Sequence, residues 1–586
     1  MAAGSDRLSG LSDDLLRRVL HFVPSQEGAL TTALSRRWRP LWRSCGAVNL
    51  VMRALKDDKD RYSDEARGRF YARRDAVVFA VHKALDAAAE AEAHGDGRVT
   101  KLTVRVEART DDKVRDFLYH DLDWRKKHDV FAAVLSHHAA CCVEELQIAG
   151  VDSDDGTPMF FERSKYEESS NINGLGIFPL ALDSLPSKTL RVLEITNCSD
   201  LTPATATIPP SFPLLESLRL RHCNVPLENL QDIVDAAPSL AIIHLDSVLL
   251  EDDEKRHQRR NLHVITPPPE QGRLLRFLRC PAATALVLDR CSLKEEGTLE
   301  IYAPMLRRFR YRGVVRHISL SPPPPHLARA ELTLTEHGYV RDRDAHAARQ
   351  SFWGTVRGFS HAKEMKLRVR QLEEIATTNE TRQAKLLPVL RRLERLELQG
   401  VYSSAGKVPP EAAIENLLSC CPALRDLRIN LSTSHEDANK KYQYGEDFLK
   451  RKRRSEFQES VNRFKRRRAQ TMMVAGDEKD GVNYDEVPDL PGLSGHYFES
   501  LRRCLRRVSL QFRRQRTDCF GTKLIKFFAE NAKVLEELCV DAGNERIGEH
   551  MNLEIKKWIA NSSKRRRIDS ASATKQVRVL SLTRSN

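Results

Sequence analysis

Two histidines and two cysteines stand close together in the stretch His137-His138-Ala-Ala-Cys141-Cys142. Structural zinc sites are built from four nitrogen and sulfur ligands of these residue types. Neighbouring residues on a helix point about 100° apart, so two adjacent pairs cannot direct four side chains at one ion. No second His/Cys cluster at ligand spacing supplies the missing ligands. His138 and Cys142 could share one face of a helix, and we expect packing residues here and no metal.

Motifs for enzymatic chemistry are absent from the sequence. It has no phosphate-binding glycine loop, no His-Glu-x-x-His motif and no nucleophile elbow. Carboxylates are abundant, but nothing in the sequence pairs them. We therefore expect a protein that is not an enzyme and that uses no cofactor.

Positive charge is the other chemical signal of this 586-residue chain, whose net charge is +14. Residues 450–468 hold ten Lys or Arg against two Glu, and the four basic residues 564–567 follow later. These two runs carry 12 of the 14 surplus charges. A duplex-binding protein spreads basic residues over a folded face, so we do not expect nucleic-acid binding.

The first basic run consists of two clusters separated by the ten residues Ser455–Phe464. This spacing resembles a bipartite nuclear import signal, which an import carrier would bind. The alternative is a solvated charged loop. The residues of the predicted signal are Lys450, Arg451, Lys452, Arg453, Arg454, Lys465, Arg466, Arg467 and Arg468.

The sequence also restricts the compartment. The N-terminus lacks the apolar core of a signal peptide, and no run of about 18 apolar residues could span a membrane. The twelve cysteines form no Cys-x-x-Cys motif, which favours free thiols in a reducing compartment. We expect a protein of the nucleus and/or the cytoplasm, without membrane contact.

The pattern Leu-x-x-Leu-x-Leu, with apolar substitutions, recurs along the chain and predicts its architecture. Copies start at residues 190, 215, 240, 283, 306, 393, 424, 505, 535 and 577, with weaker ones at 99, 143, 327 and 362. The first three are 25 residues apart, within the leucine-rich-repeat period of about 20–29 residues. Four copies follow a proline closely, and proline cannot continue a helix. The predicted unit is a helix, a proline stop and a short strand.

Three cysteines fit this repeat. Cys198, Cys223 and Cys291 each lie three residues after the last apolar position of a copy. Leucine-rich repeats place Asn or Cys at this point, where the chain turns off the strand. We therefore assign these cysteines a structural role.

The side chains between the buried leucines would face the concave side of the array, where a target protein could bind. The candidates are Arg219, Arg221, His244, Asp246, Glu397, Arg428 and Asn430. Residues 432–496 are polar, charged and poor in repeat signal, which predicts a disordered insert. The expected domains are 5–47, a repeat solenoid at 95–431, the insert at 432–496, and terminal repeats at 497–586.

Apolar residues near the N-terminus recur at helical spacing. One helix is predicted from Ser12, as N-cap, to Pro24; a second over about 26–35; and a third from about Arg36. In the third, Trp38 and Trp42 share one face with Leu41, which favours packing over nucleic-acid stacking. So small a core needs a partner.

The stretches "DRLSGLSDDLLRRVL" and "LSRRWRPLW" resemble the plant F-box over some forty positions. One departure is Ser12, where the family usually has proline. The resemblance implies docking to a Skp-type adaptor and, through it, to a cullin. The residues implied in that contact or its support are Leu11, Ser12, Leu15, Leu16, Leu20, Leu34 and Trp38.

The C-terminal stretch, best at "FFAENAKVLEEL", is similar to the FBD domain of plant F-box/leucine-rich-repeat proteins; terminal capping repeats are the alternative. The fold class is thus α/β: a small three-helix F-box, then an irregular leucine-rich-repeat solenoid (horseshoe) with a disordered insert. The resemblance implies the substrate-recognition subunit of a Skp-cullin-F-box ubiquitin ligase. The alternative is a nuclear interaction scaffold with a non-degradative or vestigial F-box. Whether a small molecule bridges the target stays open.

Overall fold

The computed structural model describes residues 10–31, 33, 35–53, 64–93, 98–108, 111–119, 129–152, 176–202, 211–250, 275–291, 298–314, 318–335, 345–378, 385–402, 408–432, 487–512, 520–541, 555, 558–560 and 578–581. The chain divides into two compact units, Met1–Leu306 and Arg307–Asn586. None of the helices in the described ranges has an apolar stretch sufficient to cross a lipid bilayer.

The first unit begins with three short helices, α1 (Asp13–Leu20), α2 (Ser25–Thr31) and α3 (Trp38–Arg43). Their bounds differ from those predicted. α1 ends before Pro24, whose carbonyl accepts a hydrogen bond from the N–H of Gly28 in α2. Ser12 occupies the N-cap position of α1, but its side chain makes no capping hydrogen bond. The predicted N-cap position of Ser12 is confirmed.

A parallel sheet follows in the first unit, in the order β1-β2-β3-β5-β7-β8-β10. Its strands are β1 (Ala47–Arg53), β2 (Lys101–Ala108), β3 (Glu145–Asp152), β5 (Val192–Thr196), β7 (Ser217–Arg221), β8 (Ile242–Asp246) and β10 (Ala285–Asp289). The sheet therefore starts at Ala47, before the predicted solenoid start at residue 95. A degenerate copy of the pattern, Cys45-x-x-Val48-x-Leu50, precedes and enters β1 in register with the copy at residue 99, and it was the signal that could have indicated this.

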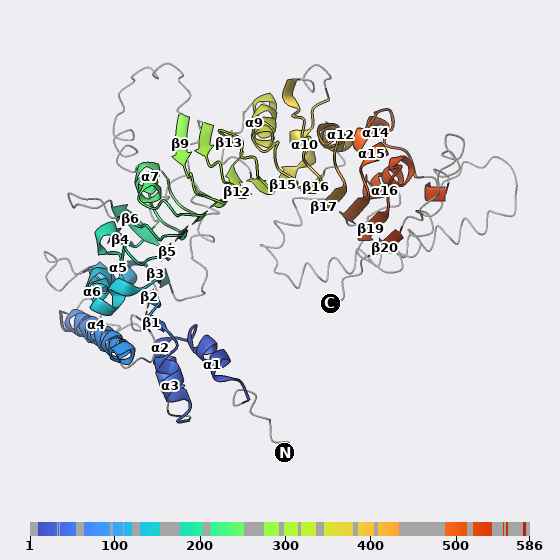
Figure 1. Ribbon diagram of the computed structural model, residues 1–586. Helices are drawn as coiled ribbons and strands as arrows, with labels where there is room; N and C mark the ends of the chain where they lie inside the picture. The colour runs from blue at the N-terminus through green and yellow to red at the C-terminus, as the bar shows by residue number, and fades with distance from the viewer. Residues whose placement is uncertain are drawn as a thin grey trace, which may run out of the picture. The chain divides into compact units, whose positions relative to one another are not determined.

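Helices cover one side of this sheet (Figure 1): α4 (Asp64–Ala93), α5 (Asp111–Tyr119), α6 (Val130–Leu135) and α7 (Leu227–Asp235). The 3-10 helix η1 (His138–Cys142) follows α6, and η5 (Leu182–Ser184) follows β4. Two pairs of short parallel strands complete the unit. They are β4 (Phe178–Ala181) with β6 (Cys198–Thr202), and β9 (Leu275–Arg279) with β11 (Thr298–Tyr302).

The second unit repeats this arrangement with the parallel order β12-β14-β15-β16-β17-β18-β19-β20. Its strands are β12 (Arg308–Val314), β13 (Ile318–Leu320), β14 (Arg329–Thr335), β15 (Glu364–Gln371), β16 (Arg395–Val401), β17 (Asp426–Ser432), β18 (Arg507–Phe512), β19 (Glu537–Asp541) and β20 (Arg578–Ser581). Its helices are α9 (Ala345–Gly358), α10 (Leu372–Ile375), α12 (Glu411–Cys420), α14 (Pro491–Ser494), α15 (Glu499–Arg503) and α16 (Phe520–Asn531).

The repeat pattern explains the register. Leu193 of β5 pairs with Leu218 of β7, and Ile195 pairs with Leu220; all four side chains are fully buried. Because a strand alternates its side chains between two faces, the residues between them face away from the helices. Every predicted copy, from residue 99 to residue 577, leads into a strand within two residues. The predicted α/β solenoid is confirmed.

The predicted insert, 432–496, overlaps the described residues only at its ends. Strand β17 extends to Ser432. At the other end, Val487, Leu490 and Leu493 are buried, and the buried ammonium of Lys526 in α16 lies 2.8 Å from Asp489 Oδ1. The insert therefore ends before residue 487, earlier than predicted. Residues 433–486, including the predicted import signal, lie outside the described residues.

Candidate docking surfaces

The three N-terminal helices share a small apolar core. Leu16 and Leu20 of α1 are fully buried and pack with Leu41 of α3. Trp38 and Trp42 lie against this cluster. The tryptophans are therefore packing residues, as predicted, while the neighbouring arginines at 36, 39 and 43 are exposed.

The same helices leave large apolar side chains in solvent. Leu15, Val19 and Phe22 are 49 %, 42 % and 67 % exposed, and Leu30 of α2 is also exposed. Leu15 and Val19 lie one turn apart on the same side of α1. Phe22 follows in the turn just after the helix, where its N–H donates to the carbonyl of Val19. We call Leu15, Val19 and Phe22 the outer face of α1. Contiguous exposed apolar groups on so small a module are typical of a docking site.

The structure divides the predicted adaptor residues into two groups. Leu15 and Ser12 are exposed, Leu16 and Leu20 form the core, and the partly buried Leu11 and Trp38 pack against it. Leu34 lies outside the described residues. The prediction missed three exposed residues: Val19, Phe22 and Leu30. The four-residue step from Leu15 to Val19 was the signal that could have revealed the outer face.

Arg37 ties the start of α1 to the turn before α3. Its Nη2 lies 2.7 Å from Asp13 Oδ1 and donates to the backbone carbonyl of Leu11 over 2.6 Å. Both side chains of this ion pair are partly exposed, so the pair itself contributes little to stability. Its effect is geometric: it holds the first turn of α1 against α3.

Strand β1 connects these helices to the sheet through Asn49. The Asn49 amide donates to the carbonyls of His21 and Val23, over 2.9 and 3.0 Å, and its backbone N–H donates to Ser25 Oγ over 2.8 Å. Asn49 is buried. It thus supplies hydrogen-bond donors to two backbone carbonyls that follow α1 and to the Ser25 hydroxyl at the start of α2. These bonds fix the helices to the first strand of the sheet.

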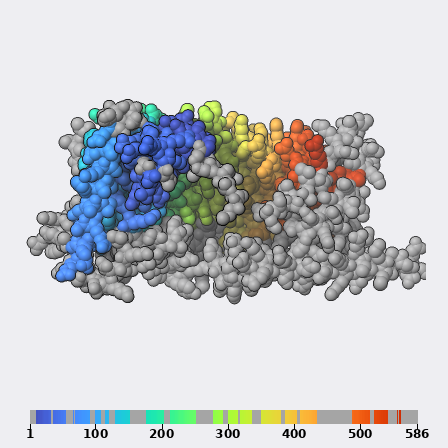
Figure 2. Space-filling view, turned by 90° about the horizontal axis from the view of Figure 1, so that it is seen from below, coloured from blue at the N-terminus to red at the C-terminus, as the bar shows by residue number. Residues whose placement is uncertain are grey.

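Helix α4 lies beside the three-helix segment on the surface (Figure 2). Its Ala84, Ala87 and Ala88 line a small pocket together with Trp42 of α3. Trp42 also approaches α2 closely, since a Cβ added to Gly28 would lie 2.6 Å from the Trp42 ring. Small residues on both sides therefore make room for this indole.

The seven predicted target residues all lie on the face of the sheet opposite the helices, where they alternate with the buried positions of their strands. Most of them have partners within this face. They pair as Arg221 with Glu194, Asp246 with Arg290, Glu397 with Lys366, Arg428 with Asp426, and Asn430 with Gln511. Among the described residues, Arg219 makes neither an ion pair nor a side-chain hydrogen bond. Target binding by these residues stays a prediction.

A ladder of left-handed turns ends successive strands of the first unit. Asn197, His222, Ser247 and Arg290 have φ between 51° and 65°.

Burial lowers the pKa of His222, while the nearby carboxylate of Asp246 opposes this. Burial also favours a raised pKa at Asp246, but its hydrogen bond from Arg290, 2.6 Å long, leaves that pKa lowered.

The predicted structural cysteines stand directly after these turns. Cys198, Cys223 and Cys291 are buried. The Cys223 thiol donates to the carbonyl of Ile195 on the preceding strand, over 3.5 Å. Burial raises the pKa of Cys223 to about 12, so this thiol is unreactive at neutral pH.

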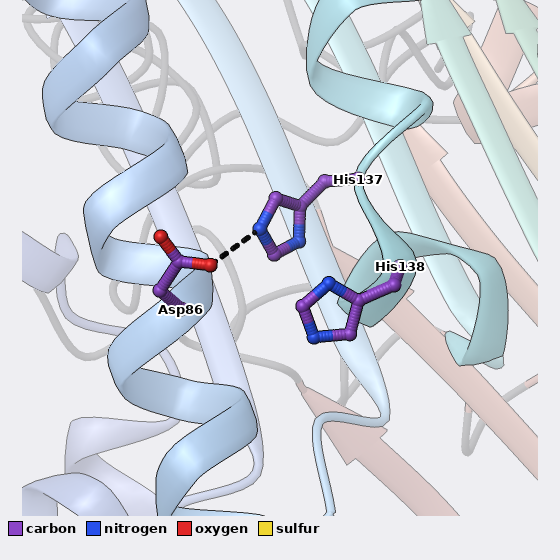
Figure 3. Close-up of side chains that lie close together, drawn as sticks. All are labelled: Asp86, His137 and His138. Carbon is purple, nitrogen blue, oxygen red and sulfur yellow. Dashed lines mark hydrogen bonds and ion pairs between the residues drawn. The ribbon is translucent and has the colours of Figure 1, made fainter.

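The His137–His138 pair meets an acidic residue that the sequence did not indicate (Figure 3). Asp86 of α4 lies 2.9 Å from Nε2 of His137, and potential ligand atoms of Asp86, His137 and His138 lie within 4.8 Å of one another. The backbone N–H of Ala139 donates to Nδ1 of His137. Nε2 therefore carries the hydrogen and donates it to Asp86. This hydrogen bond connects α4 to the residue that precedes η1.

Comparison with known proteins identifies relatives over short stretches. No family model matches the chain. An F-box/FBD/LRR-repeat protein of Arabidopsis thaliana is 50 % identical over 56 residues, covering 10 % of this chain and 12 % of the relative. An FBD-associated F-box protein of the same plant is 52 % identical over 44 residues, covering 8 % of this chain and 24 % of the relative. Over these stretches the chain is similar to plant F-box/FBD/leucine-rich-repeat proteins.

Another F-box/FBD/LRR-repeat protein of Arabidopsis is 36 % identical over 63 residues, covering 11 % of this chain and 15 % of the relative. The chain thus matches these relatives over less than a quarter of their length. The predicted resemblance is confirmed at the level of the family. We refer to α1–α3, the helices whose sequence resembles the plant F-box, as the F-box from here on.

Proposed function

We propose that this protein is the substrate-recognition subunit of a Skp-cullin-F-box type ubiquitin ligase. The F-box docks a Skp-type adaptor, which connects it to a cullin, and the solenoid holds the target protein. The chain performs no covalent chemistry itself. It raises the effective concentration of a target lysine near a loaded conjugating enzyme.

One observation carries this proposal. The F-box has a complete inner core around Leu16 and Leu20, yet its outer face keeps Leu15, Val19 and Phe22 in solvent. A helix with an unpaired second apolar face is typical of a module that binds a partner. The F-box-containing relatives support the assignment of that partner to a Skp-type adaptor.

The bonds of Asn49 give the proposal a mechanical basis. They connect the end of α1 and the start of α2 to strand β1 of the sheet. An adaptor bound at the outer face would therefore be held in a defined orientation to the sheet of the first unit. Such positioning lowers the entropic cost of bringing a target lysine to the reaction.

A binding titration of purified Skp-type adaptor against the full chain tests the proposal. Leu15→Arg places a charge in the outer face and should weaken binding by at least about 30-fold, as for a central interface residue. Met305→Arg is the matched control, because Met305 is similarly exposed, at 51 %, and lies outside the F-box. It should leave binding unchanged. A folded, unmodified chain that does not bind the adaptor would contradict the proposal.

A further inference from the structure

Strands β12, β14 and β15 of the second unit present nine side chains in three rows on the sheet face opposite the helices. Their register aligns Arg308 with Arg329 and Glu364, Arg310 with Glu331 and Lys366, and Arg312 with Thr333 and Arg368. Six of the nine are basic and two are acidic, a surplus of four positive charges. We call these nine residues the basic face.

The next three strands lack this surplus. In β16, β17 and β18 the equivalent rows are Arg395, Asp426 and Arg507; Glu397, Arg428 and Ser509; and Gln399, Asn430 and Gln511. Three are basic, two are acidic and four are neutral, a surplus of one positive charge. Of these six strands, β12, β14 and β15 thus carry most of the surplus positive charge.

The two carboxylates of the basic face are already engaged. Nη2 of Arg329 lies 2.6 Å from Oε1 of Glu331, and Nε of Arg310 lies 3.8 Å from Oε2 of the same carboxylate. Glu364 pairs with Arg395 on the neighbouring strand β16. The basic face therefore keeps cations that its own carboxylates do not neutralise.

Arg308 and Arg368 are the clearest of these cations. Both are exposed, and neither makes an ion pair or a side-chain hydrogen bond within the described part of the chain. Arg308 also stands directly beside Arg329 in the register. Like charges on adjacent strands repel each other, which an anionic partner would relieve.

We propose that the basic face binds an acidic segment, rich in Asp and Glu, of the target protein. Neighbouring strands are about 4.8 Å apart and alternate residues about 7 Å apart, so an array of guanidinium groups meets several carboxylates of one short segment. Arginine binds a carboxylate through two parallel hydrogen bonds. This inference rests on the proposed function, since it names the chemistry of the protein that the solenoid holds.

An acidic protein segment fits this surface better than a nucleic acid. Single-stranded nucleic acids stack their bases on aromatic side chains, and none of the nine residues is aromatic. Glu331 and Glu364 stand between the cations and would repel a continuous phosphate backbone. Separate carboxylates of a peptide can reach the arginines individually.

Fluorescence anisotropy of fluorescein-labelled hexaglutamate, titrated with the full chain at about 50 mM salt, where screening is weak, tests the inference. The double variant Arg308→Gln/Arg368→Gln removes two unpaired cations and should weaken binding about tenfold, on the order of 0.7 kcal/mol for each charge. Arg507→Gln/Arg578→Gln is the matched control, with the same charge change on the same face of β18 and β20. It should change binding less than about twofold.

Several outcomes would overturn the inference. The first is that the unmodified chain does not bind hexaglutamate. The second is that the Arg308/Arg368 variant binds hexaglutamate as tightly as the unmodified chain does. The third is that the Arg308/Arg368 variant and the control variant lose the same amount of hexaglutamate affinity. If the unmodified chain binds a labelled oligothymidine more tightly than hexaglutamate, and the Arg308/Arg368 variant loses this binding, the partner of the basic face would be a nucleic acid and not an acidic protein segment. Adaptor titration of the same samples separates the two proposals. If the unmodified chain binds hexaglutamate but does not bind the adaptor, only the proposed ligase role is contradicted.

Discussion

Leu15 and Leu16 are neighbours in α1 with opposite surroundings: Leu15 is 49 % exposed, whereas Leu16 is fully buried against Leu20 and Leu41. Adjacent residues on a helix point about 100° apart, so one turn of α1 serves both a core and a surface. Stability and docking can therefore be changed separately by substitutions at consecutive positions.

Truncation of Leu16 should unfold the F-box, whereas truncation of Leu15 should not. Leu16→Ala removes a buried side chain and costs about 2–5 kcal/mol. Leu15→Ala removes an exposed one and should cost less than about 0.5 kcal/mol. Hydrogen exchange of the α1–α3 amides in the full chain measures both. Equal loss of protection in the two variants would mean that Leu15 belongs to the core.

Proline at position 12 should stabilise the F-box. The φ of Ser12 is −65°, the value that proline imposes, and its carbonyl still accepts from Leu16 N–H. Ser12→Pro should add about 0.4–1 kcal/mol by restricting the unfolded chain. Ser12→Ala is the control and should be neutral, because the hydroxyl makes no capping bond. Slower exchange of the α1 amides in Ser12→Pro would agree; faster exchange would show strain at this turn.

Two glycines in helices should respond oppositely to alanine. A Cβ on Gly28 would lie 2.6 Å from the Trp42 ring, whereas one on Gly68 of α4 would meet no atom within 4 Å. Gly28→Ala should destabilise the F-box by about 1–3 kcal/mol. Gly68→Ala should stabilise α4 by about 0.5–1 kcal/mol. Amide exchange in α2 and α4 reports both effects, and unchanged exchange in α2 would indicate that Trp42 can move away.

The first unit should lose stability as pH falls below about 6.5, the ordinary pKa of histidine. Burial lowers the pKa of His222 in the folded state, so the unfolded chain takes up a proton first. The loss begins at the unfolded pKa and stops growing once pH falls below the lowered folded pKa. His222→Asn should reduce this dependence, because asparagine suits the left-handed turn, as Asn197 does.

Amide exchange in β7 and β8 at pH 7.5 and pH 5.5 measures this effect. The unmodified chain should exchange faster at pH 5.5, relative to unstructured reference peptides, than the His222→Asn variant does. The same pH dependence in both proteins would assign the effect to another group.

The repeat solenoid could be predicted because the spacing of apolar residues in each copy indicates which residues of its strand are buried. Two apolar residues at fixed spacing, as in Leu193 and Ile195, suffice to place a strand and its buried face. Strand β1 was missed because its copy of the pattern is degenerate, with Cys45 in the place of the first leucine. Its position also depends on hydrogen bonds with His21, Val23 and Ser25, which lie at least 24 residues away in the chain.

The docking surfaces were less predictable, since they depend on which face of an element stays uncovered. Leu15 and Leu20 are equally apolar in sequence, and only the packing against α3 separates them. The meeting of Asp86 with His137 joins residues 51 positions apart and has no local signal. The basic face likewise depends on the register of three strands.

The central claim is that the outer face of α1 contacts the adaptor. Site-specific photo-crosslinking tests it most directly, with Phe22→p-benzoylphenylalanine in the full chain and purified Skp-type adaptor. Phe79→p-benzoylphenylalanine is the matched control, because Phe79 of α4 is 61 % exposed, close to the 67 % of Phe22. The account predicts a crosslink to the adaptor from position 22 and none from position 79. No crosslink from position 22 while the adaptor is bound, or equal crosslinks from both positions, would contradict it.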